Sequence, residues 1–340
     1  MTKIKRLYWL LNKEGLLGLK SKIAEKKQKW WWRWPLQAGN KILGWENMMN
    51  FWIKIDSKAE EEDWGTASKE LISKLGIELD TGEDLERIRK NKKATLVLGV
   101  NHEAILEPFI IASLLGDRRV SLISLKVLQV LGRAYSKYIM PVMPRRYAKD
   151  EKRFKRWIVN KVHPRARLYG IEELKVVEID EMNEKVFNRA AKRLMEGMDV
   201  VLFATGGKVA QAAWGRGLGE IVNRVSKEKR SDVQIAFFHF DGLRQMEVVK
   251  RFWMAANGKK LKKINVRVNC HKGFELSRIE QALGERFEPK SIVEYIKAWS
   301  LEKFGYNKVR ERNMWKWPKL VYQPVYARLM TIWAFVRMRI

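Results

Sequence analysis

A histidine and a carboxylate, His102 and Glu107, follow a short apolar run in the middle of the chain. The run, residues 94–99, predicts a buried strand. Pro108 is tolerated in the first turn of a helix, so we expect a helix from there to about Gly116, with Glu107 at its N-cap. His102 would then lie in a strand-to-helix turn, where open α/β sheets place their ligands. A carboxylate folded back onto its ring would fix the tautomer and stabilise the imidazolium, which suits a general base.

The same spacing also fits a polar turn with a hydrogen-bonded histidine and no catalytic role. The surrounding residues favour chemistry, because Asn101-His102 followed by Glu107-Pro108 resembles the first motif, NHxxxxD, of the PlsC-like glycerolipid (lysophosphatidic acid) acyltransferases. Glu107 stands where that motif has Asp, as in the related lipid A late acyltransferases. The resemblance implies that His102 and Glu107 are catalytic and that Asn101 belongs to the substrate site.

Two further segments resemble later motifs of this family. In the second motif a short strand ends in an arginine that binds the acceptor's phosphate, and Arg145 or Arg146 fills that position after residues 140–144. A guanidinium suits a phosphate through paired hydrogen bonds. The alternative is a pair of surface arginines in a very basic protein.

The third segment is a predicted strand, residues 199–203, that runs into a glycine turn resembling the third motif, FPEGTR. Phe203 matches its Phe, whereas Ala204 replaces its Pro and Thr205 its Glu. Glycines let a backbone approach a ligand closely, and a lysine can hold a phosphate. The implied binding residues are Thr205, Gly206, Gly207 and Lys208.

The resemblance implies acyl transfer without an enzyme nucleophile, metal or cofactor. His102 would take the proton from an acceptor hydroxyl, whose oxygen attacks an acyl thioester of coenzyme A or acyl carrier protein. The expected acceptor is a lysophospholipid or a glycerol phosphate. Thr205 carries no charge, which leaves open a glycolipid acceptor of the lipid A type, or a catalytically inactive membrane- or nucleic-acid-binding protein.

Composition points to an anionic partner. The 340 residues carry a net charge of +29, a pI of about 10.1 and 15 Trp. Lys and Arg beside Trp are typical of a membrane interface, and a basic run at residues 145–167 could also dock an acyl carrier protein. The sequence contains no zinc-finger spacing or RNP1 motif, which argues against nucleic acid. The single cysteine, Cys270, excludes an internal disulfide and suits a small core residue.

These patterns predict an α/β fold: a mixed, mainly parallel central sheet flanked by helices, with amphipathic helical extensions at both ends. We expect three regions: a basic, Trp-rich membrane-associating region (1–75), an acyltransferase-like domain (76–305) and a basic amphipathic helix (306–340). Residues 56–93 are interpreted as a connector. No run reaches the roughly 18 apolar residues of a spanning helix, so we expect a peripheral protein on the cytoplasmic face of a membrane. Other expected elements are strands at 120–124, 233–242 and 264–268 and a helix at 288–304.

Overall fold

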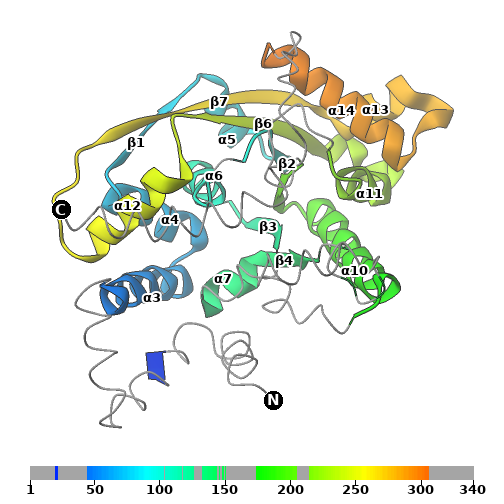
Figure 1. Cartoon of the computed structure of the whole chain (residues 1–340). Helices are drawn as coiled ribbons and strands as arrows, with labels where there is room; N and C mark the ends of the chain where they lie inside the picture. Colours follow the sequence, from blue (N-terminus) through cyan, green and yellow to red (C-terminus); the bar gives the residue numbers. More distant parts are fainter. Residues whose placement is uncertain are drawn as a thin grey trace, which may run out of the picture.

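A computed structural model gives the architecture of the chain (Figure 1). It describes residues 20–21, 44–102, 104–116, 118–125, 132–143, 145, 148, 150, 174–204 and 214–305. Of the two predicted terminal extensions, residues 306–340 lie entirely outside the described residues, as do residues 1–43 apart from residues 20–21, whereas residues 44–75 are described. Within the described part, no helix is both long and apolar enough to cross a membrane.

A seven-stranded sheet forms the centre, in the order β1-β7-β6-β2-β5-β3-β4. Five neighbouring strands, from β6 to β4, are parallel to one another, β7 is antiparallel to β6, and β1 is parallel to β7. The predicted fold class, a mixed and mainly parallel sheet flanked by helices, is confirmed. The strands are β1 Ile77–Thr81, β2 Ala94–Gly99, β3 Val120–Leu125, β4 Ile139–Val142, β5 Asp199–Phe203, β6 Val233–Asp241 and β7 Ile264–Glu275.

Helices cover both faces of this sheet. One face packs against α3, α4, α5, α6, α7 and α12, and the other against α10, α11, α13 and α14. The α-helices are α3 Trp45–Glu61, α4 Trp64–Lys74, α5 Asp84–Lys90, α6 Glu107–Leu115, α7 Arg133–Tyr138, α10 Val176–Met195, α11 Gly217–Arg224, α12 Gln245–Ala256, α13 Leu276–Leu283 and α14 Pro289–Lys303. Two short 3-10 helices, η4 Lys227–Asp232 and η5 Gly284–Arg286, complete the described elements.

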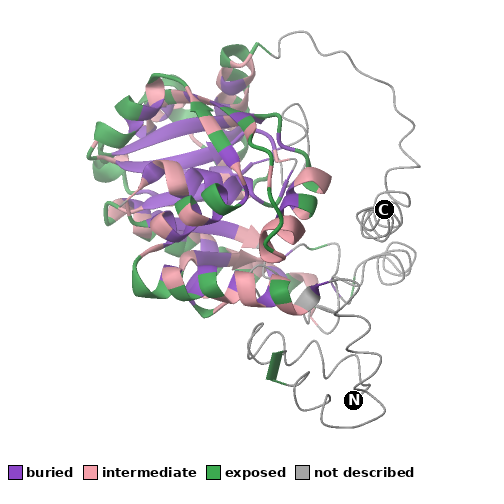
Figure 2. Cartoon of the chain, turned by 90° about the vertical axis from the view of Figure 1, so that its left-hand side faces the viewer, coloured by how far each residue is buried: buried purple, intermediate pink, exposed green. Residues whose placement is uncertain are grey.

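Burial on both faces explains why β2 is apolar throughout. Successive side chains of a strand point to opposite faces, so Val97 enters the core beneath α6, whereas Leu96 and Leu98 enter the core beneath α10. Figure 2 shows the buried strands enclosed by helices whose outer faces are exposed. A central parallel strand covered on both sides reads as a continuous hydrophobic run, which is how the sequence revealed it.

The predicted boundary at residues 75 and 76 falls inside the folded unit. Helices α3 and α4 belong to the core cluster under α6, where Trp52 and Trp64 are 7% and 2% exposed. The interpretation of residues 56–93 as a connector was incomplete. A polar helix through Leu71, Ile72 and Leu75 was expected and is present as α4, whereas the edge strand β1 was not expected. Charged residues alternate with Ile77 and Leu79 in β1, since only one side of this edge strand packs inward.

The other expected elements are found, with some changes of length. The strand expected at 264–268 extends to Glu275, because its second half pairs with β6 rather than with β1. The short strand expected before Arg145 is β4. Helix α6 begins at Glu107 rather than Pro108, with Leu106 as its N-cap residue, and ends before Gly116 as predicted.

The five parallel strands give the molecule two unlike ends. We call the end where β2 to β6 finish the carboxyl edge, and the opposite end the amino edge. The segments that carried the sequence motifs follow β2, β4 and β5, and parallel pairing brings the ends of these strands to the carboxyl edge. This is the edge at which open α/β sheets place ligands.

Candidate functional site

The turn after β2 is fastened to the end of β6. The Val100 N–H donates to the carbonyl of Phe238 (2.9 Å), which extends the strand pairing by one residue. The Asn101 amide then makes two bonds to the Phe240 backbone: Nδ2 donates to its carbonyl (2.8 Å), and Oδ1 accepts from its N–H (2.9 Å). Asn101 is 3% exposed. Its observed partners are therefore backbone groups, and the substrate contact predicted for it stays a prediction.

His102 and Glu107 meet as the spacing predicts. Nδ1 of His102 is hydrogen-bonded to Oε2 of Glu107, and Oε1 of the same carboxylate accepts the N–H of Ala104 at 2.9 Å. The Glu107 side chain is fully buried, whereas that of His102 is 29% exposed. Because a carboxylate accepts at Nδ1, the neutral ring carries its proton there, which leaves the lone pair on Nε2. Nε2 has no partner among the described residues.

Two residues outside the predicted set of site residues shape the ring's position. Phe203, at the end of β5, packs against His102 with 4.4 Å between ring centroids. Its strand partner is Gly99, and a Cβ there would lie 2.2 Å from the Phe203 ring. Any side chain at position 99 would push Phe203 away and remove the support of His102. The sequence held a signal only for Phe203, through its match to the third motif.

The second predicted group is partly placed. Arg145 lies three residues beyond β4, is 62% exposed and forms an ion pair with Asp180 of α10. One turn along α10, the Asn183 amide holds the Met143 backbone from both sides, accepting its N–H and donating to its carbonyl, each at 2.9 Å. Helix α10 therefore fixes the start of the segment that carries Arg145 at the carboxyl edge.

The remaining predicted binding residues, Arg146, Thr205, Gly206, Gly207 and Lys208, lie outside the described residues. The structure thus brings together Asn101, His102, Glu107 and the end of β5. It places Arg145 at the same edge, two strands beyond β5 in the sheet order, without a recorded contact to His102.

No protein-family model matches the sequence, and a search among curated proteins gives no match. The chemistry of the site is therefore argued from its residues. In the part of the chain that the structure describes, no group of three or more His, Cys, Asp or Glu side chains could hold a metal ion.

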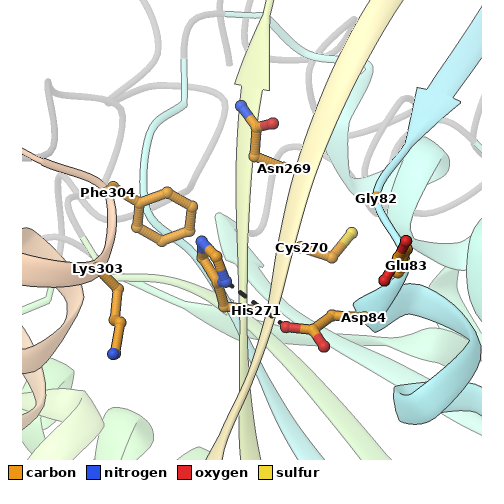
Figure 3. A pocket seen from close by; sticks show the side chains of 8 residues that line it. All are labelled: Gly82, Glu83, Asp84, Asn269, Cys270, His271, Lys303 and Phe304. Carbon is orange, nitrogen blue, oxygen red and sulfur yellow. Dashed lines mark ion pairs between the residues drawn. The ribbon is translucent and has the colours of Figure 1, made fainter.

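A separate cavity of about 520 Å³ lies beside residues 269–271 of β7, just beyond the residues that pair with β1 (Figure 3). The rings of His271 and Phe304 line it in an edge-to-face arrangement, with 4.8 Å between their centroids. Asp84 approaches Nδ1 of His271 at 3.6 Å and accepts the N–H of Lys272 at 3.4 Å. The predicted site residues do not line this cavity, so we assign it no part in the predicted reaction.

Proposed function

We propose that this protein is a membrane-associated O-acyltransferase. It moves a fatty acyl group from coenzyme A or acyl carrier protein to a hydroxyl of a lysophospholipid or glycerol-phosphate acceptor. The observation that carries the proposal is the pairing of His102 with buried Glu107 at the carboxyl edge. A carboxylate bound to Nδ1 leaves Nε2 as the basic atom, and the exposure of the ring leaves it accessible to a substrate.

The reaction needs one base and no covalent enzyme intermediate. Nε2 of His102 takes the proton of the acceptor hydroxyl as its oxygen attacks the thioester carbonyl. Glu107 stabilises the imidazolium that forms, because its charge lies against the opposite nitrogen. The tetrahedral intermediate then collapses: the carbon–sulfur bond breaks, the sulfur leaves as a thiolate, and His102 returns the proton to it. The products are an ester and a free thiol.

The acceptor phosphate would be recognised by basic side chains at the same edge. Arg145 is the described candidate: its pair with Asp180 is solvent-exposed, and such pairs contribute only about 0–1 kcal/mol. A phosphate dianion, with its bidentate geometry and higher charge, can therefore replace Asp180 at little cost. Lys208 and Arg146 complete the proposed phosphate site.

Lipid analysis after expression in a strain that lacks its own lysophosphatidate acyltransferase would test the function. We expect the missing diacyl phosphate lipid to reappear with the natural chain and not with His102→Ala produced at the same level. The purified protein, given lysophosphatidate with acyl-CoA or acyl carrier protein thioesters, should then identify the donor. A chain that acylates no lipid in cells or in vitro would contradict the proposal.

A further inference from the structure

Three large apolar side chains are exposed in the part of the molecule that the structure describes: Ile105 (42%), Val177 (63%) and Met182 (37%). Isolated exposed apolar residues are ordinary on a soluble protein. Their distribution is not ordinary, because all three lie at or beyond the carboxyl edge of the sheet, on two separate elements.

Ile105 lies in the turn between β2 and α6, past the end of β2. The N–H of Ile105 donates to Oε1 of Gln245 at 2.8 Å, so the first residue of α12 stabilises the backbone of this turn. The side chain is therefore exposed on a fixed backbone, three residues from His102.

The position of α10 follows from its contacts. Asn183 bonds to Met143, so this turn of the helix is level with the carboxyl end of β4. The helix then runs toward the amino edge, where Asp199, four residues after its end, bonds to Arg119. Val177 precedes Asn183 by six residues, which at 1.5 Å per residue places it about 9 Å further out. Val177 therefore projects beyond the sheet.

The amino edge has the opposite character. Its described turns, at residues 91–93, 118–119, 196–198 and 226–232, contain no exposed large apolar side chain. Charged groups stand there instead, such as Lys227, whose side chain is 78% exposed. Among the described residues, both edges thus carry charged side chains, and only the carboxyl edge adds large exposed apolar ones.

We propose that the carboxyl edge is the face that lies against an anionic lipid bilayer, with Ile105 and Val177 entering the headgroup boundary. A protein partner would require a contiguous patch of about 800 Å², whereas these side chains stand on different elements. Separate apolar side chains among basic groups suit an interface of headgroups and acyl chains. Three exposed basic residues supply that charge at this edge: Arg145 after β4, Arg216 before α11 and Arg244 before α12. The inference rests on the proposed function in one respect: a two-chain lipid remains in the bilayer, so His102 would have to face it.

Cysteine labelling tests this orientation without an activity assay. Cys270 is 4% exposed and burial raises the pKa of its thiol to about 12, so a maleimide at neutral pH should react with an introduced cysteine instead. Full-length Ile105→Cys and Val177→Cys, with Lys227→Cys at the amino edge as the control, would carry an environment-sensitive fluorophore. Each would be mixed with phosphatidylglycerol-containing vesicles and with phosphatidylcholine vesicles.

We expect a blue shift and stronger emission at positions 105 and 177 with the anionic vesicles, a smaller change with neutral vesicles, and no change at position 227. An equal response at 227, or no response at 105 and 177, would overturn the proposed orientation. Acyl transfer by the unlabelled natural chain in detergent is measured separately. If the proposed orientation is wrong but the function is right, acyl transfer is still observed in detergent. If the proposed function is wrong, no acyl transfer is observed, and the fluorescence response to vesicles is unaffected.

Discussion

The two edges of the sheet use the same kinds of side chain in different ways. At the amino edge, Arg118 donates to the carbonyls of Ile88 (3.0 Å), Asn91 (2.8 Å) and Lys93 (2.7 Å) and to the carboxylate of Asp199 (2.6 Å). Asp199 is 1% exposed. The N–H groups of this guanidinium donate to groups of the protein itself, and they join the turn before β2 to the start of β5.

At the carboxyl edge the polar side chains keep atoms that are accessible to a ligand. His102 is fixed through Nδ1 and leaves Nε2 without a described partner, and the described partner of Arg145 is the partly exposed carboxylate of Asp180. The comparison teaches that a buried charged pair is not itself a sign of function. Asp199 and Glu107 are both buried and both paired, but only the partner of Glu107 presents a basic atom to solvent.

Removing the base should produce the largest effect on activity. His102→Ala should lower acyl transfer by at least ~100-fold, the usual scale for general base catalysis. His102→Gln is the matched variant, since its amide can still donate toward Glu107 but cannot take a proton at neutral pH. Steady-state rates with a saturating donor measure the loss. Near-natural activity in both variants would remove His102 from the mechanism.

Breaking the buried pair at the amino edge should instead reduce stability. Asp199→Ala leaves Arg118 inside the fold without its carboxylate, and removing one partner of a buried pair costs about 3–5 kcal/mol. Urea denaturation should give that loss in the free energy of unfolding. The rate per folded molecule should stay natural, because the change lies at the edge opposite His102. A variant that is stable but inactive would contradict this division between the edges.

Glu107→Gln should have a smaller effect on activity than loss of the histidine. The amide can still orient the ring but cannot stabilise an imidazolium by charge. We therefore expect a drop of about tenfold in kcat, smaller than the ~100-fold expected for loss of the base itself, with little change in either KM. The measurement is a kcat and KM series beside the His102 variants. A loss larger than that of His102→Ala would indicate that Glu107 acts directly on substrate.

The smallest expected effect concerns the segment after β4. Asn183→Ala removes both bonds to Met143, at about 1 kcal/mol each. We expect about 0.7–1.4 kcal/mol of this loss to appear in acceptor binding, which raises the acceptor KM by about threefold to tenfold, while the donor KM and kcat stay near natural values. Glu184→Gln is the control, because the neighbouring Glu184 pairs with Arg224 and not with this segment. Equal changes in the two variants would show that Asn183 supports only the helix.

Local pattern was sufficient for much of the fold and for the centre of the site. The apolar run of β2, the position of Pro108 and the spacing of His102 and Glu107 predicted a strand, a helix and a histidine–carboxylate pair, and all three are present. They follow from local rules, since a turn of five residues can bring these two side chains together whatever the rest of the chain does. The start of the helix differed by one residue because Glu107 already has helical geometry.

The errors have a common origin. Strand β1 was missed because it is a short edge strand whose charged residues alternate with only two apolar ones. Trp52 and Trp64 were assigned to a membrane region because composition does not say what a tryptophan packs against. Both were decided by neighbours distant in sequence. The inner faces of α3 and α4 are core because α6, α7 and α12 offer them apolar surfaces.

Sequence alone therefore established the chemical pair and most of the strands around it. Tertiary structure decided which distant residues hold that pair in place and which side of the histidine ring is accessible to solvent. Asn101 clamps Phe240 across 139 residues, Arg118 holds Asp199 across 81, and Gly99 makes room for Phe203 on the neighbouring strand. These contacts depend on the order of strands in the sheet. That order is set by which surfaces bury one another best over the whole chain, so no local periodicity encodes it.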